Sequence, residues 1–298
     1  MNYHLLGRSA LSISAIGVGC MSLGEDDNTN AGIIHQAIES GINFFDTADI
    51  YQQGFNEATV GKAIKGKRKQ VILATKAGNQ PRPDGKGWDW NPRKEYILKA
   101  VENSLSRLQT DYIDLYQLHG GTLEDPIDET IEAFELLQQQ GKIRYYGISS
   151  IRPNVIREYA QRSKAVSVMM QYSLLDRRPE ETCLPLLEQQ HIGVLARGSV
   201  AKGLLVNKPA AAYLNYSEEQ VAKAAAAVQA VSNDQRGPSQ TALRFVLHQP
   251  AITSAIVGIR TMEQLEEAIK AVNAPALSTE EINTLTQSIP VNYYDQHR

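Results

Sequence analysis

The chain reads VILATK at residues 71–76, PRKEYILKAVENSLSRL at 92–108 and YIDLYQLH at 112–119. The first and third stretches are short apolar runs of strand length. The middle stretch places Ile97, Val101 and further apolar residues three or four positions apart, which is the spacing of an amphipathic helix. A strand, a helix and a second strand in this order predict a βαβ unit with parallel strands.

The same alternation extends over the whole chain. Apolar runs recur about once every ~37 residues, the size of one βα unit, and most are continuously apolar, as strands buried on both faces are. No linker rich in Gly, Ser or Pro interrupts them. This favours an α/β fold with a single (β/α)8 TIM barrel domain over 1–298, rather than two domains or a doubly wound sheet. The eight runs are 15–19, 43–48, 71–76, 112–119, 143–149, 166–172, 192–197 and 254–259.

Two segments go beyond this repeat. HLLGRSALSIS at 4–14 predicts an N-terminal β-hairpin before the first barrel strand, because two short strands flank a turn that contains glycine. Residues 201–238 exceed an ordinary βα connection. They include SEEQVAKAAAAVQAV at 217–231, which predicts an extra helical insertion after the seventh strand.

The composition excludes several classes of protein. An apolar fraction of 42% argues against disorder, and Cys20 and Cys183 allow one disulfide at most. The 30 basic and 33 acidic residues give a formal net charge of −3, which disfavours a nucleic-acid partner. No apolar run is long enough for a membrane span. We therefore expect a cytoplasmic protein with no nucleic-acid or membrane partner, present as a monomer or a weak homo-oligomer.

Four ionisable side chains lie at or just after predicted strand ends. Asp46 and Tyr51 follow the second run, Lys76 ends the third and His119 ends the fourth. Each alone would more often be a structural residue, but strand ends meet at one face of a barrel, where catalytic residues lie. There Lys76 could lower the pKa of Tyr51, Asp46 could orient Lys76, and His119 could orient a carbonyl oxygen. This arrangement suits carbonyl reduction, for which a nicotinamide must donate the hydride.

Two late loops are candidates for binding the phosphates of that cofactor. RGSVAKGLL at 197–205 follows the seventh strand, and VGIRTMEQLEEA at 257–268 follows the eighth and leads into a helix. These loops form the usual phosphate site of such barrels, and Arg260 adds a positive charge. GVGCMSLG at 17–24 lacks the spacing of a dinucleotide fingerprint, so we assign it to the first strand and its loop. We assign no metal site.

A series of motifs spans the chain: NFFDTADIY, GFNEATVGKAI, VILATKAG, SLSRLQTDYIDLYQLH, GKIRYYGISS, VMMQYSLL, VLARGSVAKGLL and SAIVGIRTMEQLEEAI. In this order and spacing they resemble the aldo-keto reductase family. DRRPEE at 176–181 is similar to a bacterial oxidoreductase branch within it. The resemblance implies an enzyme that uses NADP(H) to reduce aldehydes or ketones to alcohols.

The resemblance also implies roles for individual residues. Asp46, Tyr51, Lys76 and His119 match the catalytic tetrad of the family, with Tyr51 as the proton donor. Among the implied cofactor residues, Ser149 and Gln171 hold the carboxamide, and Tyr172 stacks on the nicotinamide ring. The others are Met21, Asp46, Arg197, Gly198, Ser199, Val200, Gly203, Gly258, Arg260, Gln264 and Glu267.

Several positions depart from the family pattern. Ser150 stands where Asn is usual, and RGS at 197–199 replaces an aromatic-Ser-Pro run. Gln264 stands where many members place an Arg near the 2′-phosphate, and Ala268 replaces an Asn near the adenine. Arg260 could still bind a 2′-phosphate, so we predict NADP rather than NAD as the cofactor.

The long loop after the third strand carries both tryptophans, Trp88 and Trp90. Trp88 could line a substrate pocket together with Tyr51 and His119. Either tryptophan could instead pin the loop to the barrel. The tail at 290–298 is expected either to fold over the barrel mouth or to be disordered.

Two other functions stay open at this point. The chain could be a regulatory or sensor subunit that binds a nicotinamide nucleotide with little turnover. It could also be a Schiff-base lyase with Lys76 as the nucleophile. The neighbouring Asp46 argues against the lyase, because a carboxylate keeps an amine protonated.

Overall fold

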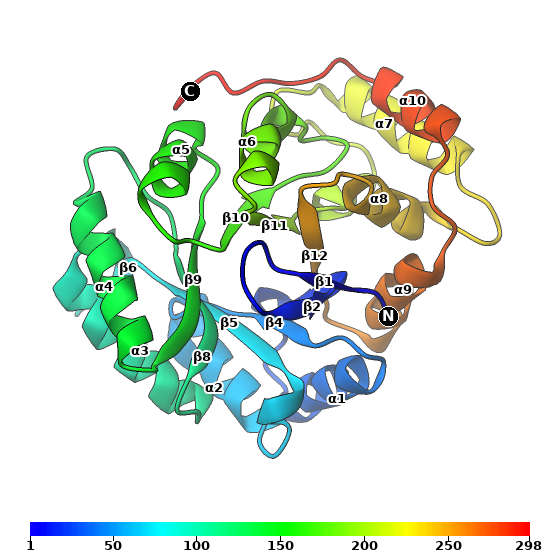
Figure 1. The fold of residues 1–298 in the computed structure, drawn as a ribbon. Coiled ribbons are helices and arrows are strands. Elements are labelled where there is room, and N and C mark those ends of the chain that lie inside the picture. Colours follow the sequence, from blue (N-terminus) through cyan, green and yellow to red (C-terminus); the bar gives the residue numbers. More distant parts are fainter.

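The eight predicted strands all form, and they close into one parallel barrel in the computed structural model, which describes residues 1–298 (Figure 1). Strands that follow one another around the barrel also follow one another in sequence, and β12 pairs back with β3. The prediction of a (β/α)8 barrel is therefore confirmed. The strands are β3 (Ile16–Gly19), β4 (Phe44–Asp46), β5 (Ile72–Ala77), β8 (Ile113–Leu118), β9 (Ile143–Ser149), β10 (Ser167–Gln171), β11 (Gly193–Arg197) and β12 (Ile252–Gly258).

Helices surround the barrel because each has one apolar stripe to bury. In α3 (Lys94–Leu108), Ile97 and Val101 are fully buried, as their spacing predicts. The helix begins two residues later than the predicted stretch 92–108, because the N-cap is Arg93, whose backbone is extended. The other helices of the ring are α1 (Asp27–Glu39), α2 (Phe55–Ala63), α4 (Ile127–Gln139), α5 (Pro153–Arg162), α6 (Cys183–Gln189), α8 (Pro238–Leu247) and α9 (Met262–Asn273).

The predicted N-terminal hairpin closes the bottom of the barrel. Its strands β1 (Tyr3–Leu5) and β2 (Ser12–Ser14) are antiparallel. Leu6 and Ile13 are fully buried against side chains that fill the barrel interior. Gly7 has a φ of +54°, and a Cβ at this position would lie 2.4 Å from the Val166 carbonyl oxygen. The hairpin therefore packs directly on the barrel, and the opposite end is the open one.

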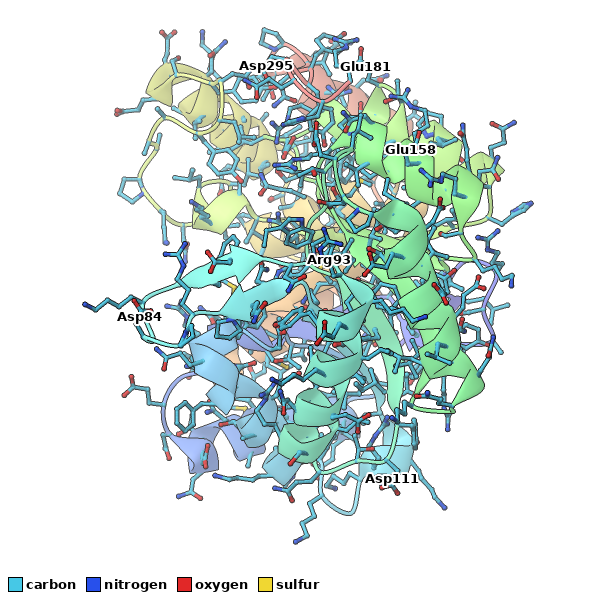
Figure 2. All side chains as sticks on the ribbon, turned by 90° about the vertical axis from the view of Figure 1, so that its left-hand side faces the viewer. Asp84, Arg93, Asp111, Glu158, Glu181 and Asp295 are labelled. Carbon is cyan, nitrogen blue, oxygen red and sulfur yellow. The ribbon has the colours of Figure 1, made fainter.

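The open end, or mouth, carries the additions to the barrel. The loop after β5 forms an unpredicted hairpin of β6 (Asn79–Pro81) and β7 (Trp88–Trp90). Figure 2 shows Asp84, in the turn of this hairpin, on the opposite side of the molecule from Asp111, which precedes β8. The predicted helical insertion is present as α7 (Glu218–Ala230). An unpredicted helix, α10 (Thr279–Gln287), follows α9.

The C-terminal tail packs against the loop after β10 and the start of α5, at the rim of the barrel rather than over its mouth. The backbone N–H of Arg177 donates to Asn292 Oδ1 (3.0 Å). The N–H of Asn154 donates to the His297 carbonyl (2.9 Å). The chain thus ends beside α5 (Figure 1). None of the helices combines the length and apolar character needed to cross a membrane.

Candidate active site

Asp46, Tyr51, Lys76 and His119 meet at the barrel mouth, as their strand-end positions predict. Lys76 Nζ donates to Asp46 Oδ2 (2.6 Å), to the Thr47 carbonyl oxygen (2.7 Å) and to Tyr51 Oη (3.4 Å). The rings of Tyr51 and His119 meet edge to face with centroids 5.8 Å apart. Because β4, β5 and β8 are neighbours and parallel, their carboxyl ends bring these groups together.

The electrostatics of the site follow from burial. Burial opposes the charge on Lys76, but the neighbouring Asp46 and Tyr51 outweigh it and raise the pKa of the ammonium. Burial raises the pKa of Tyr51 above its usual value, and Lys76 offsets this only in part. Lys76 thus acts on the Tyr51 pKa in the predicted direction, but burial outweighs its effect and the net shift is upward. Burial, followed by the charges of Lys76 and Arg197, lowers the pKa of His119 to about 3, so its ring is neutral near pH 7.

Supporting residues that sequence reasoning missed surround these four. Gln117 Nε2 donates to Asp46 Oδ1 (3.2 Å) from the barrel interior. Glu57 of α2 is fully buried and accepts hydrogen bonds from Thr75 Oγ1 and Arg107 Nε, both at 2.6 Å. The sequence contains one indication of these supporting residues, because each is a polar residue inside a predicted buried strand or motif. Buried polar groups need hydrogen-bonding partners.

The cofactor candidates Gln171 and Arg197 lie side by side at the ends of β10 and β11. Arg197 Nη1 donates to Gln171 Oε1 (3.1 Å). The charge of Arg197 acts on Asp46, Tyr51 and His119. Both residues therefore border the tetrad. Ser149 ends the neighbouring strand β9 and is partly exposed.

Tyr172 does not lie where the resemblance implies. It is fully buried, its ring stacks on Phe245 of α8 at a centroid distance of 6.1 Å, and its hydroxyl donates to Glu180 (2.8 Å). Neighbouring residues on a strand point to opposite faces, so a Gln171 that faces the mouth turns Tyr172 toward the helices. This placement leaves no free ring face for a nicotinamide, so the stacking role implied by the resemblance is wrong.

The loop after β11 has an unusual backbone. Gly198, Ala201, Lys202 and Gly203 all have φ between +46° and +93°, which is costly for the two residues that are not glycine. Ser199 is buried, and its Oγ has no hydrogen-bond partner. A backbone held in this form with an unsatisfied hydroxyl fits a loop that binds a polar ligand. Val200 lies in the same loop and is partly buried.

The start of α9 forms the second candidate phosphate site. Thr261 caps the helix, and Gln264 Oε1 accepts from the N–H of Arg260 (2.8 Å). The Arg260 side chain is exposed, and no acidic side chain pairs with it. Glu267 instead accepts from Gln240 of α8 (2.5 Å). Met21 and Gly258 are exposed where β3 and β12 end.

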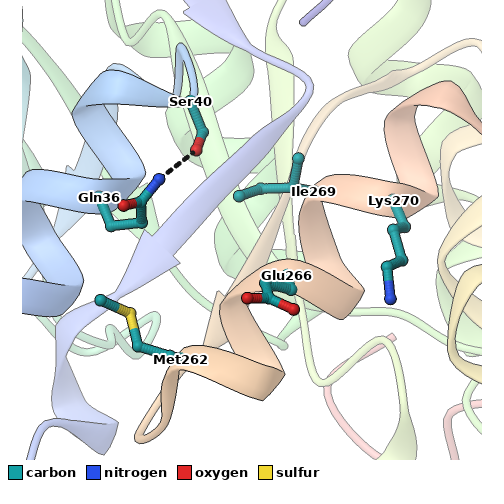
Figure 3. A pocket seen from close by; sticks show the side chains of 6 residues that line it. All are labelled: Gln36, Ser40, Met262, Glu266, Ile269 and Lys270. Atoms are coloured by element: carbon teal, nitrogen blue, oxygen red, sulfur yellow. Dashed lines mark hydrogen bonds between the residues drawn. The ribbon is translucent and has the colours of Figure 1, made fainter.

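The other flank of α9 faces α1 across a surface hollow of about 370 Å³ (Figure 3). Gln36 and Met262 are among its lining residues, and Gln36 Nε2 donates to Ser40 Oγ (3.3 Å) across one turn of α1. This hollow is separate from the tetrad and from the α8 flank that holds Glu267. We therefore leave it out of the candidate active site.

The two tryptophans of the β6–β7 hairpin have different environments. Trp90 packs on Gly78 and Gly120, where an added Cβ would lie within 2.7 and 3.1 Å of its ring, and its Nε1 donates to Asp125 (2.8 Å). Trp88 is 49% exposed. Trp90 therefore pins the hairpin to the strand ends, and the half-exposed Trp88 takes no part in this attachment.

Comparisons with known proteins place relatives along nearly the whole chain. Residues 15–290 match the model of the Aldo/keto reductase family. An uncharacterized oxidoreductase, YqkF of Bacillus subtilis, is 53% identical, and the match covers all of both chains. Aldo-keto reductase YhdN of the same organism is 32% identical over 97% of this chain and 94% of its own.

Solved structures give the same result for the fold. The holo form of aldo-keto reductase AKR11C1 from Bacillus halodurans superposes with a TM-score of 0.94 at 48% identity, covering 100% of this chain and 99% of that one. Its apo form superposes with a TM-score of 0.86. The similarity therefore extends over the barrel and its additions alike.

Proposed function

The chain belongs to the aldo/keto reductase family, a family of oxidoreductases that use nicotinamide cofactors, and we propose that it reduces aldehydes or ketones to alcohols with NADPH. The observation that carries this proposal is the buried ion pair of Lys76 and Asp46, with the hydroxyl of Tyr51 in contact with Lys76 and a neutral His119 beside it.

Each residue of the site has a defined task in this reaction. A bound nicotinamide would supply the hydride to the carbonyl carbon. Tyr51, which its raised pKa keeps protonated, gives its proton to the carbonyl oxygen, and the positive charge of Lys76 stabilises the phenolate that results. The neutral ring of His119 donates a hydrogen bond that orients the carbonyl oxygen. Asp46 keeps Lys76 charged, which disfavours the Schiff-base lyase.

The residues of the two late loops fit a phosphorylated dinucleotide. The unpaired guanidinium of Arg260 supports NADP over NAD, because arginine binds a 2′-phosphate through charge-assisted hydrogen bonds. Ser199 has a buried hydroxyl available for the pyrophosphate region. On this proposal NADPH binds more tightly than NADH.

Two free, buried cysteines support the cytoplasm as the compartment, since thiols persist where the environment is reducing. Burial raises the pKa of the Cys20 thiol, which favours a packing role. The proposed partner is a small carbonyl compound, with the protein acting as a monomer or weak homo-oligomer and binding neither nucleic acid nor membrane.

The substitution Tyr51→Phe tests the proposal. Loss of the proton donor should lower kcat for a panel of aldehydes and ketones by about 10²–10⁴-fold, followed by NADPH absorbance. The Kd of NADPH should change less than about twofold, because only a hydroxyl is removed. Tyr293→Phe, in the exposed part of the tail, is the matched control and should keep full activity.

Full activity of the Tyr51→Phe variant would contradict the assignment of the proton donor. Tighter binding of NADH than of NADPH would contradict the cofactor preference. Tight NADPH binding by the wild-type protein without turnover of any carbonyl in the panel would favour the sensor subunit instead.

A further inference from the structure

Gln171 lies at the barrel mouth with its side chain held from several directions. It ends β10 beside Arg197 of β11. A Cβ on Gly198 would lie 3.3 Å from the Gln171 Cγ, so the loop after β11 passes close over this side chain. Its amide is therefore confined to a small region next to the tetrad.

Protein groups occupy most of the hydrogen-bonding capacity of this amide. Nε2 has two hydrogens, and it donates one to Asp176 Oδ2 (2.8 Å) and one to Tyr213 Oη (3.0 Å). Oε1 accepts from Arg197 Nη1 (3.1 Å) and has a second lone pair. The only hydrogen-bonding capacity left for a ligand is thus one acceptor position on Oε1.

A rotation that exchanges the two ends of the amide is strongly disfavoured. It would turn the oxygen of Gln171 toward the Asp176 carboxylate and its NH₂ group toward the Arg197 guanidinium. Both new contacts would pair like with like, acceptor with acceptor and donor with donor. Hydrogen bonds to charged groups are the stronger ones, so both ends of the amide favour the same orientation.

Asp176 and Tyr213 are themselves fixed. Asp176 is fully buried, and Arg178 donates to both of its carboxylate oxygens, from Nε to Oδ1 (2.7 Å) and from Nη2 to Oδ2 (2.9 Å). Tyr213 belongs to a turn after β11 that is closed by mutual backbone hydrogen bonds with Tyr216. Neither acceptor can follow Gln171 if its amide rotates.

We propose that Asp176, assisted by Tyr213, is the positioning residue that makes Gln171 present its carbonyl oxygen to the cofactor. The primary carboxamide of a nicotinamide ring can donate an N–H to that oxygen. An analogue whose ring carries a methyl ketone in its place cannot. The pair thereby makes the site specific for the NH₂ group of the carboxamide. This inference rests on the proposed function, because it concerns how the same site recognises its nucleotide.

The test compares the binding of two nucleotides by fluorescence titration, without turnover. These are NADP⁺ and its 3-acetylpyridine analogue, in which a methyl group replaces the NH₂ group of the carboxamide. The wild-type protein should bind the analogue about 3–10-fold more weakly, as expected for the loss of one hydrogen bond. Asp176→Asn should reduce this Kd ratio at least about threefold. Tyr213→Phe removes a hydroxyl that can pair with either end of the amide, so it should change the ratio by less than about twofold.

Tyr216→Phe is the matched control, because Tyr216 lies in the same turn as Tyr213. The Tyr216 hydroxyl donates to the Pro290 carbonyl (2.7 Å) and does not contact Gln171. It should leave the Kd ratio unchanged. A purely structural effect would weaken both nucleotides equally and leave the ratio intact. If Asp176→Asn does not fold, Arg178→Lys replaces it, because this variant breaks the two-point contact that fixes Asp176 and should lower the ratio in the same direction.

Equal binding of the two nucleotides by the wild-type protein would overturn the inference, as would an Asp176→Asn variant that folds and keeps the wild-type Kd ratio. Both results leave the proposed function standing. Failure of the wild-type protein to bind either nucleotide would instead overturn the proposed function, and the inference with it.

Discussion

Lys76 keeps its charge in the interior because oxygen atoms surround its ammonium group. An ammonium has three hydrogens, and here Asp46, Thr47 and Tyr51 each accept one. Without such partners a buried charge costs several kcal/mol. No hydrogen of Lys76 is left free, so in the proposed reaction Lys76 would act through its positive field on the phenolate of Tyr51.

Asp49, between Asp46 and Tyr51, gives a prediction about pH. Burial, and then the charge of Glu57, raise the pKa of Asp49 to about 7. Its Oδ1 has no hydrogen-bond partner. An aspartate in the unfolded chain titrates near ~3.9, so the folded protein binds this proton more tightly. The free energy of unfolding should therefore fall as pH rises from about 4 to 7, by up to about 4 kcal/mol.

The substitution Asp49→Asn should remove this pH-dependent loss of stability, because the amide cannot ionise. We expect the variant to have a higher Tm than the wild type at pH 8 and a similar Tm near pH 4, measured by circular dichroism. Asp111→Asn, at an exposed position, is the control and should follow the wild type at all pH values. Parallel pH curves for Asp49→Asn and wild type would contradict the prediction.

At the scale of elements, Trp90 is the large side chain that attaches the β6–β7 hairpin to the barrel. A two-stranded hairpin is marginally stable by itself, and this one is attached through the ring of Trp90 and its hydrogen bond to Asp125. Trp90→Ala should lower the free energy of unfolding by about 2–4 kcal/mol in urea titrations. It should also make the turn at 82–87 sensitive to proteases.

Trp88→Ala is the matched control in the same hairpin. Because Trp88 is half exposed, its loss should change the free energy of unfolding by less than about 1 kcal/mol. A larger loss of stability from Trp88→Ala than from Trp90→Ala would show that the two roles are reversed.

Across the whole molecule, the two ends of the barrel have separate tasks. The hairpin that ends in β2 fills the bottom with Leu6 and Ile13, whereas every tetrad residue lies at the mouth. Ile13→Ala should therefore lower the free energy of unfolding by about 2–5 kcal/mol, measured in urea. The Kd of NADPH should stay within about twofold of wild type. A large change in that Kd would mean that the bottom of the barrel also shapes the site.

Most of the fold could be predicted from local sequence patterns. The apolar runs located all eight barrel strands, and the Gly-containing turn located the N-terminal hairpin. The β6–β7 hairpin was missed because its strands are short and polar, and Trp90 attaches it through contacts with distant residues. The start of α3 was placed two residues early, since Pro92 alone does not specify the N-cap.

The sequence by itself determined the barrel and the meeting of Asp46, Tyr51, Lys76 and His119, because hydrophobic periodicity specifies strands and parallel strands bring their ends together. Only the tertiary structure decided the direction of the Tyr51 pKa shift and the burial of Tyr172. It also decided the contacts of Asp176 and Tyr213 with Gln171. The physical reason is that desolvation and side-chain hydrogen bonds depend on distances between residues far apart in the chain, which no local pattern records.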